Sequence, residues 1–408
     1  MKSKARWTFM VYMAGDNSLS SAGDADLAEM RTVGSSDIVN CVVQFDNAGP
    51  NGTRRYRIHR DGIGEETIML EETDSGSSEV LLDFVRWAVN EYPAERYVLV
   101  LWNHGGGWAP TEIERIAANV GSVGFDDREA VERSSSPLGH AFFRSTLERI
   151  LSLQSAGERA ICSDDGSCHS LDTLELGRVM RCIAELLGRP LDLLGMDACL
   201  MSNLEVAYQL RDHVAYIVAS EETEPAQGWP YQHIVRLIVN DPEITTAELA
   251  SKLVRLYIVS YSGGTTSKNV TQSALSLAAI HSLVAPLDEL AGALCAEGAA
   301  VASVVWNSQR ATQHFFSGTL WDIGDLGVNL KHHAISEAVR VAAQRTVEHL
   351  TPGPTNLVLA ESHIGPKVQR CTGISIYMPS IESMSQFYDE LDFARDHGWS
   401  QLLHTLSA

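Results

Sequence analysis

The sequence predicts an α/β fold in which helices flank a mostly parallel central sheet. Short runs rich in β-branched and aromatic residues, at 7–14, 38–45 and 97–102, alternate with amphipathic helical patterns at 22–33 and 78–92. This alternation is typical of βαβ units. Hydrophobic residues make up 45% of the 408 residues and charged residues 20%, enough for a sizeable core.

The later elements follow the same alternation after an interruption. A mobile insertion is expected over about 109–170, because residues 119–137 are polar and lack periodicity. We expect one domain over residues 1–380, with a helical C-terminal tail at 381–408 packed on it. The patterns predict helices at 138–153, 171–187, 200–214, 245–261 and 282–305, and strands at 190–197, 215–219, 356–360 and 373–378.

Two strand-like runs are each followed by a reactive side chain. Residues 96–103 lead into His104, and residues 190–197 lead to Cys199. Ligands bind at the carboxyl ends of parallel strands, where a Cys and a His supply a nucleophile and its proton-transfer partner. A helix directly after Cys199 would favour the thiolate, and backbone N–H groups of Gly105 and Cys199 would form an oxyanion hole. This combination is typical of a cysteine peptidase.

An acidic side chain precedes the candidate nucleophile by two residues. On a strand, residues i and i+2 point the same way, so the Asp197 carboxylate could share a cleft with Cys199. There it would select an Arg or Lys side chain. Asp also favours a helix N-cap, and spacing alone leaves the two roles even.

Two further segments carry candidate binding residues. Glu221 and Trp229 lie in the run SEETEPAQGWPY, which is either a cleft-lining loop or an ordinary acidic loop. Asp322 and Asp325, in LWDIGDL, are candidates for the far wall of the same pocket or for a structural turn, and we favour the turn.

The charge balance bears on partners. The formal net charge of −21 disfavours nucleic acid and anionic membrane surfaces, both of which need a basic face. The apolar N-terminal run leads into Gly15, Asp16 and Asn17 with no cleavage site, so we interpret it as a core strand and expect a cytoplasmic location. The grouping of Cys162, Cys168 and His169 lacks the second ligand pair of a zinc site.

At these residues the chain resembles the clostripain family of cysteine peptidases, in the group with caspases, legumains and gingipains. The stretches that carry the resemblance are WTFMVYMAGDNSL, LWNHGGGW, MDACLMSNLEVAYQL, ASEETEPAQGWPY and GISIYMP, spread in family order from residue 7 to about 380. The resemblance implies a caspase-like three-layer sandwich. It also implies a Cys199–His104 dyad, Asp197 at the floor of the S1 pocket, and cleavage of peptides after Arg or Lys.

The resemblance brings further expectations. Some family members mature by self-cleavage between the His and the Cys, and Arg128 and Arg133 in the polar loop suit such cleavage in a zymogen. No cofactor is required on the residues alone; calcium is implied by the resemblance only, since no EF-hand spacing is present. A regulatory protein partner is also compatible with the resemblance.

Two other functions stay open. One is a latent or non-catalytic caspase-like protein that binds a partner through the same cleft, which the intact dyad argues against. The other is acid-directed cleavage or transpeptidation on the same fold, and Asp197 opposes acid-directed cleavage because that specificity needs a basic pocket.

Overall fold

The computed structural model describes residues 4–15, 20–47, 52–71, 73–103, 171–262, 269–315, 318–379, 384–385 and 388–407. The chain divides into two compact units. The first unit holds the described residues up to 103, together with 171–198 and 226–244. The second unit holds 199–225 and the described residues from 245 onward.

The first unit is built on a mostly parallel sheet. Its strands lie in the order β6-β5-β1-β2-β3-β4, and the first four are mutually parallel. The central strand β1 is buried at every residue but one, and such burial on both faces explains its continuous apolar sequence. The strands are β1 (Ala5–Gly15), β2 (Val39–Asn47), β3 (Thr53–Arg57), β4 (Glu66–Met69), β5 (Ala94–Trp102) and β6 (Leu191–Asp197).

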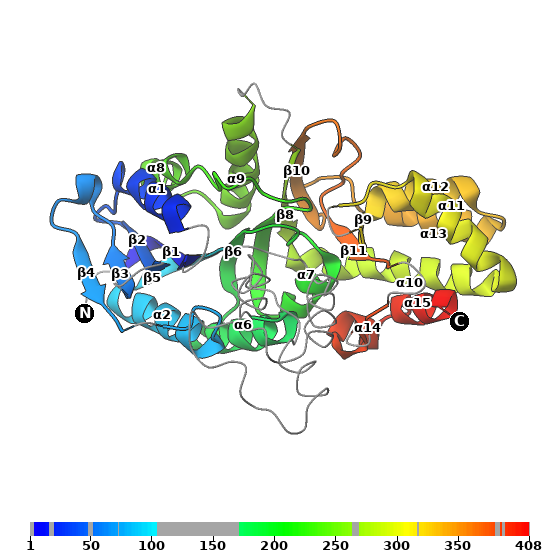
Figure 1. Ribbon diagram of the computed structural model, residues 1–408, viewed down its shortest axis with the longest axis horizontal. Helices are drawn as coiled ribbons and strands as arrows, with labels where there is room; N and C mark the ends of the chain where they lie inside the picture. Colours follow the sequence, from blue (N-terminus) through cyan, green and yellow to red (C-terminus); the bar gives the residue numbers. More distant parts are fainter. Residues whose placement is uncertain are drawn as a thin grey trace, which may run out of the picture. The chain divides into compact units, whose positions relative to one another are not determined.

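Helices cover both faces of this sheet, giving the three layers that the sequence predicts (Figure 1). On one face α1 (Ser20–Arg31) packs against α8 (Tyr231–Asn240), and on the other α2 (Ser78–Glu91) packs against α6 (Thr173–Leu187). Helix α6 begins at a capping box of Asp172 and Glu175 and ends at Gly188 in the left-handed conformation, so its sequence sets both ends.

The second unit contains antiparallel strands. Strands β7 (Val214–Ala219), β8 (Val270–Ser276) and β10 (Val358–Ile364) lie in the order β10-β8-β7. A separate ribbon pairs β9 (Leu320–Asp322) with β11 (Ser375–Tyr377). The parallel arrangement that the sequence predicts therefore holds for β1, β2, β5 and β6 in the first unit, whereas β8 pairs antiparallel with both β7 and β10 in the second.

The helices of the second unit cover its strands and pack on one another (Figure 1). Leu277–Ala296, which contains α10, is long and apolar enough to cross a membrane, yet half of it is buried, and α10 contacts α13 and α15 as a core helix does. The helices are α7 (Leu204–Leu210), α9 (Thr246–Tyr261), α10 (Ile280–Ala296), α11 (Val301–Ala311), α12 (Ile323–His333), α13 (Glu337–Glu348), α14 (Asp392–Asp396) and α15 (Trp399–Ser407).

Two predicted helices differ from the observed ones. The helix expected at 282–305 is two helices, α10 and α11, because Gly298 takes a left-handed conformation with φ +59° between them. The helix expected at 200–214 is only seven residues long and begins at Leu204, where Asn203 caps it. Both predictions are wrong because apolar periodicity in the sequence continues across a break in the helical backbone.

Candidate active site

The two strands that lead to the candidate catalytic residues are neighbours in the first unit. Strands β5 and β6 run parallel, with Trp102 paired to Asp197 at their carboxyl ends, and Asn103 N–H donates to the Asp197 carbonyl at 3.3 Å. His104 and Gly105 follow β5 in the sequence but lie outside the described residues. The chain thus brings the two strand ends together as the sequence predicts.

Cys199 does not sit at a helix N-terminus, which corrects the expectation that a helix follows it directly. Helix α7 begins at Leu204, and Asn203 is its N-cap, with its side chain accepting from Val206 N–H at 3.2 Å. The helix dipole therefore begins five residues too late to act on the sulfur at close range. Leu200, directly after Cys199, has a φ of +64°, a conformation that non-glycine residues rarely adopt.

The Cys199 sulfur instead receives a main-chain hydrogen bond. The N–H of Glu224 donates to Sγ at 3.2 Å, and the thiol is half-buried. A donor aimed at sulfur favours the negative charge that the nucleophile must carry. The loop after β7, and not a helix N-terminus, thus supplies the main-chain donor to the sulfur.

The residues that follow Cys199 are held on both sides. Leu200 N–H donates to the Glu222 carbonyl at 3.2 Å, and Ser202 N–H donates to the Ser220 carbonyl at 2.8 Å. On the other side, Ser375 N–H donates to the Ser202 carbonyl at 2.9 Å. These bonds fix the backbone beside the sulfur without a helix.

Asp197, the last residue of β6, is 5% exposed, and one of its oxygens is held in a defined orientation. Its Oδ2 accepts from Tyr231 Oη–H at 2.8 Å and from Trp229 N–H at 3.2 Å. A Cβ at Gly228, where φ is +56°, would lie 3.1 Å from the same oxygen. Since Asn203 caps α7, the alternative in which Asp197 is a helix N-cap is wrong.

The other two candidate pocket residues are buried. Trp229 is 1% exposed, and its ring lies so close to Gly195 that a Cβ there would be 2.9 Å from Cη2. Glu221 is 1% exposed and accepts from Gly373 N–H at 3.0 Å. Burial of this degree disfavours contact with substrate, so cleft lining by either residue stays a prediction.

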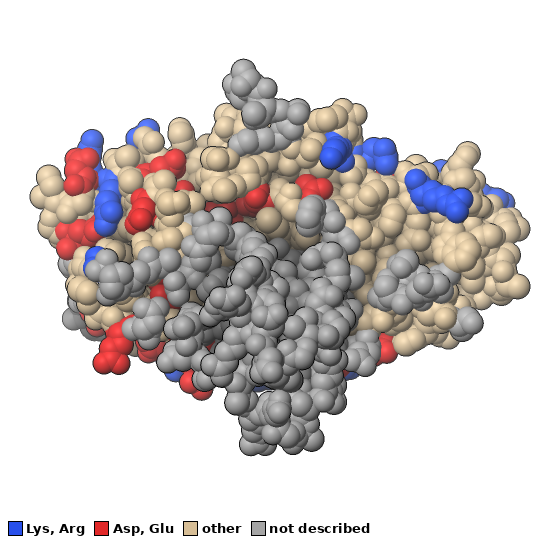
Figure 2. All heavy atoms as spheres, viewed as in Figure 1, with Lys and Arg blue, Asp and Glu red and all other residues tan. Residues whose placement is uncertain are grey.

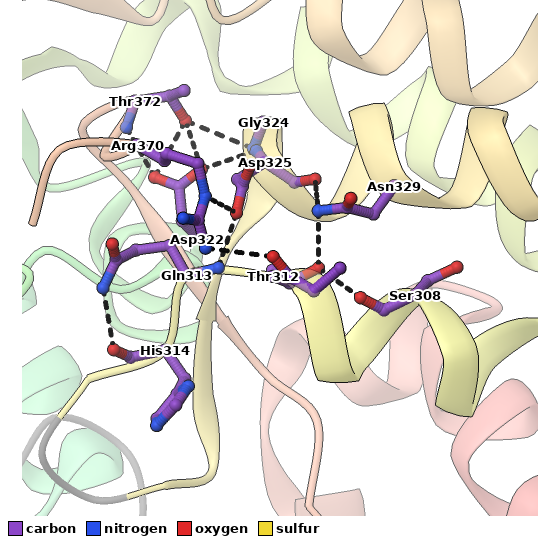
Figure 3. Close-up of polar contacts among 11 residues, drawn as sticks. Ser308, Thr312, Gln313, His314, Asp322, Gly324, Asp325, Asn329, Arg370 and Thr372 are labelled. Carbon is purple, nitrogen blue, oxygen red and sulfur yellow. Dashed lines mark hydrogen bonds and ion pairs between the residues drawn. The ribbon is translucent and has the colours of Figure 1, made fainter. Parts of the chain in front are cut away.

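Asp322 and Asp325 have the structural role that the sequence favours (Figure 3). Asp322 caps α12 by accepting from Asp325 N–H at 2.7 Å, and it also accepts from Thr372. Asp325 accepts from Arg370 Nε–H at 2.9 Å and from Gln313 N–H. Both carboxylates therefore organise the second unit.

A buried acidic cluster surrounds Asp322. The ligand atoms of Glu221, Asp322 and Cys371 lie within 4.8 Å of one another. Burial, with the neighbouring Asp322 carboxylate, raises the pKa of Glu221, and burial also raises the pKa of Asp322. The pair is therefore stabilised in a state that retains a proton.

This cluster does not fit the calcium ion that the family resemblance raises. Calcium takes six to eight oxygen ligands. The cluster offers a thiol as its third group, and both Asp322 oxygens already accept from the Thr372 hydroxyl at 3.0 Å. Two other acidic pairs in the sequence that could offer oxygen ligands to calcium, Asp126–Asp127 and Asp164–Asp165, lie outside the described residues. The expected cleavage points Arg128 and Arg133 lie outside them as well.

Three residues that contact the candidate site or lie near it were not singled out from the sequence. Glu224 reaches the sulfur and Tyr231 reaches Asp197, although each belongs to the run SEETEPAQGWPY. Asp26, which accepts from Trp102 Nε1–H at 2.8 Å, lies on the buried stripe of α1. An acid on the apolar face of a predicted helix was the signal that could have identified Asp26.

Known proteins resemble this chain in sequence and in fold. A model of the clostripain family, Peptidase C11, matches residues 11–135 and 151–405. The curated protein clostripain of Hathewaya histolytica is 28% identical over 258 residues, which are 56% of this chain and 41% of clostripain. The chain thus spans less than half the length of that relative.

Solved structures share the fold. An inactive zymogen C11 protease from Parabacteroides distasonis superposes with a TM-score of 0.67 at 19% identity, covering 97% of this chain and 99% of that one. A secreted C11 cysteine protease from Bacteroides thetaiotaomicron, in complex with an irreversible peptide inhibitor, gives 0.63 at 19% identity, with coverage of 97% and 99%. Because the family model matches most of this chain, the chain belongs to the clostripain family of cysteine peptidases.

Proposed function

We propose that this protein is a cysteine endopeptidase that cleaves peptide bonds after Arg or Lys. The observation that carries the proposal is the Asp197 carboxylate, buried at a strand end, oriented by Tyr231 and Trp229, and two residues before Cys199. A fixed carboxylate in a pocket is complementary to a guanidinium or ammonium group. Family membership supports the nucleophile.

The reaction follows from the roles of these residues. The Cys199 thiolate attacks the carbonyl carbon after the Arg or Lys residue, and backbone N–H groups of Gly105 and Cys199 stabilise the oxyanion. The C–N bond then breaks as His104 gives its proton to the departing amine. Water hydrolyses the thioester, releasing the acid and restoring the thiol–imidazole pair.

Hydrolysis of fluorogenic peptides with Arg, Lys, Asp or Ala at P1 tests this proposal. Wild type should cleave after Arg and Lys, and Cys199→Ala should lose activity by a factor on the order of 10⁴ or more. Cys182→Ala, at another half-buried free thiol, is the matched control and should retain activity. The assay with and without calcium measures any dependence on that ion.

Maturation by self-cleavage belongs to the same proposal. The Parabacteroides distasonis relative is described as an inactive zymogen. In this chain, Arg128 and Arg133 are the proposed cleavage points within the expected insertion at 109–170. Mass spectrometry of active protein should find chains ending at one of them, and a fully active intact chain would refute self-cleavage. No turnover even after limited proteolysis would instead favour a latent protein that acts through a partner.

A further inference from the structure

Three buried side chains of the second unit converge on one point. Glu221 follows β7, Asp322 stands at the start of α12, and Cys371 precedes β11, so the three come from segments far apart in the sequence. They are 1%, 0% and 6% exposed respectively. One carboxylate oxygen of each acid and the Cys371 sulfur lie within 4.8 Å of one another. Polar atoms buried together in this way are costly unless a partner satisfies them.

Two polar atoms of this cluster are not satisfied by the described part of the chain. Glu221 Oε2 accepts from Gly373 N–H at 3.0 Å, but the buried Oε1 has no donor there unless Glu221 shares a proton with Asp322. The Cys371 thiol makes no hydrogen bond to any described residue; only its main-chain N–H is bonded. Folded proteins rarely leave buried groups in this condition, so the cluster is a position where a ligand would bind.

The cluster has no cation of its own. Among the described residues, neither of its carboxyls forms an ion pair. The basic groups closest to it in sequence are paired elsewhere. Arg370 donates to Asp325 at 2.9 Å (Figure 3), and His363 Nδ1 lies 2.6 Å from Glu361 Oε1. The buried negative charge therefore has no balancing partner within this part of the fold.

Other basic side chains of the second unit lie at its surface. Figure 2 shows Lys and Arg side chains over α12 and α13. Two of the arginines pair with acids there, Arg340 with Glu337 at 2.8 Å and Arg345 with Glu289 at 2.6 Å. No described lysine or arginine is paired with the buried carboxyls, so the charge that would balance them has to come from a bound cation.

The donor set selects the class of cation. Zn²⁺ binds Cys sulfur at about 2.3 Å and carboxylate oxygen at about 2.0–2.2 Å in a tetrahedral shell, which separates such ligand atoms by roughly 3.4–3.6 Å. The observed limit of 4.8 Å is close enough for small side-chain rotations to complete that shell. Calcium and magnesium prefer oxygen ligands only, whereas a thiolate favours a softer ion such as zinc.

Asp322 retains a site for a metal bond. An ionised carboxylate accepts at about four positions. Asp322 uses one for the N–H of Asp325 and one for the N–H of Thr372. The Thr372 hydroxyl lies 3.0 Å from both oxygens, but its single proton occupies one position at a time. Capping of α12 and coordination of one ion are therefore compatible.

We propose that the second unit binds one zinc ion through Cys371 Sγ and one oxygen each of Glu221 and Asp322, with a water molecule as the fourth ligand. Binding releases two protons, one from the thiol and one retained by the pair of carboxyls, because metal ligands must be deprotonated. The site goes beyond the proposed function and does not depend on which residue the enzyme accepts at P1.

The ion would act on the backbone beside the nucleophile. Glu221 stands between Ser220 and Glu222, whose carbonyls accept from Ser202 N–H at 2.8 Å and from Leu200 N–H at 3.2 Å. Fixing the Glu221 carboxylate therefore fixes the two acceptors that flank it in the chain. We expect zinc to slow hydrogen exchange of the Leu200 and Ser202 amides.

Cobalt substitution tests whether Cys371 is a ligand. The inactive full chain Cys199→Ala, freed of metal with a chelator, should develop a thiolate-to-cobalt charge-transfer band in the near ultraviolet that zinc abolishes. Adding Cys371→Ala should remove the band and weaken zinc binding by more than about 100-fold. Cys295→Ala, at a half-buried free thiol of the same unit, is the matched control and should leave both unchanged.

A second variant keeps the hydrogen bonds of the cluster while removing a charge. In Glu221→Gln the amide oxygen still accepts from Gly373 N–H, and the amide N–H can donate to Asp322. We expect it to fold without metal and to bind zinc at least about tenfold more weakly. Zinc should raise the melting temperature of Cys199→Ala, because the ion binds the folded chain. The increase should be lost when Cys371→Ala is added.

The outcomes separate the parts of this inference. A cobalt band that persists in Cys371→Ala, or a zinc affinity that neither variant weakens, would overturn the site and leave the two acids as a proton-sharing pair. Weakened zinc binding in both variants, with amide exchange at Leu200 and Ser202 unaffected by zinc, would support the site and overturn its effect on the backbone. All these measurements use Cys199→Ala, so failure to cleave arginine peptides would overturn the proposed function alone.

Discussion

The buried carboxyls of the two units differ in the main-chain donors that they bind. In the second unit, Glu221, Asp322 and Glu205 accept main-chain N–H groups of Gly373, Thr372 and Tyr377 respectively. All three donors belong to the short segment 372–377, which contains β11. These acids therefore hold the chain together, because a lost acceptor would leave a buried N–H unsatisfied.

In the first unit, Asp26 accepts from the side chain of Trp102, and Asp197 accepts from the side chain of Tyr231 and from Trp229 N–H. Side-chain donors orient a carboxyl without tying two distant segments of backbone. The comparison teaches that burial alone does not distinguish a structural acid from a functional one. The kind of donor and the position at a strand end are what support the proposed role of Asp197.

The largest effect is expected for Asp322→Ala. The substitution removes the N-cap of α12 and leaves the N–H groups of Asp325 and Thr372 without their acceptor. We expect the free energy of unfolding to fall by about 3–5 kcal/mol, measured by chemical denaturation. Asp212→Ala, an exposed acid in the same unit, should cost less than about 0.5 kcal/mol. If Asp322→Ala were as stable as wild type, Asp322 would not have the structural role that its hydrogen bonds indicate.

Asp197→Asn should affect specificity and leave stability almost unchanged. The amide oxygen still accepts from Tyr231 and Trp229, but the charge that would attract Arg or Lys is lost. We expect kcat/KM for an arginine peptide to fall about 100-fold, since removing one member of a buried charge pair costs about 2–5 kcal/mol. Equal losses for arginine and alanine peptides would contradict a cation-binding role.

The pH dependence of stability should come from the buried acids of the second unit. Glu205 is fully buried on α7, and burial raises its pKa to about 7 from an ordinary value of 4.5. Its contribution to stability is therefore complete below pH 4.5 and is lost as pH rises through about 7, with a slope of up to about 1.4 kcal/mol per pH unit.

The test of that dependence is the melting temperature of wild type and Glu205→Gln between pH 4 and pH 8. The decline with pH should be shallower in Glu205→Gln, which cannot ionise. Glu348→Gln, an exposed site on α13, should decline as wild type does. Parallel curves for all three proteins would show that Glu205 does not titrate in this range.

The smallest effect is expected for Tyr231→Phe. It removes the 2.8 Å hydrogen bond to Asp197 Oδ2 but leaves the one from Trp229 N–H. We expect kcat/KM for an arginine peptide to fall roughly fivefold, about 1 kcal/mol, mainly through KM. Tyr208→Phe, whose hydroxyl bonds Asp396 in the second unit, is the matched control. An unchanged KM in Tyr231→Phe would show that Asp197 needs no orientation by this hydroxyl.

Local patterns accounted for much of the fold. The strands β1, β2 and β5 and the helices α2, α6 and α9 were predictable, because apolar periodicity and capping residues act within a few positions along the chain. The same reasoning failed at 200–214 and 282–305. There the breaks depend on Asn203 and Gly298, whose local effects an apolar pattern obscures.

The sequence by itself determined that Asp197 and Cys199 stand two residues apart at the end of a buried strand, because that spacing is covalent. Only the tertiary structure decided what surrounds them. Asp197 is oriented by residues more than 30 positions away, and the segment 372–377 is held by acids 50 to 172 positions away. Such pairings depend on how distant segments pack, and no periodicity along the chain encodes them. Asp26 is the clearest case: its sequence marks a charge on an apolar helix face, and packing alone brings it into the layer of Asp197.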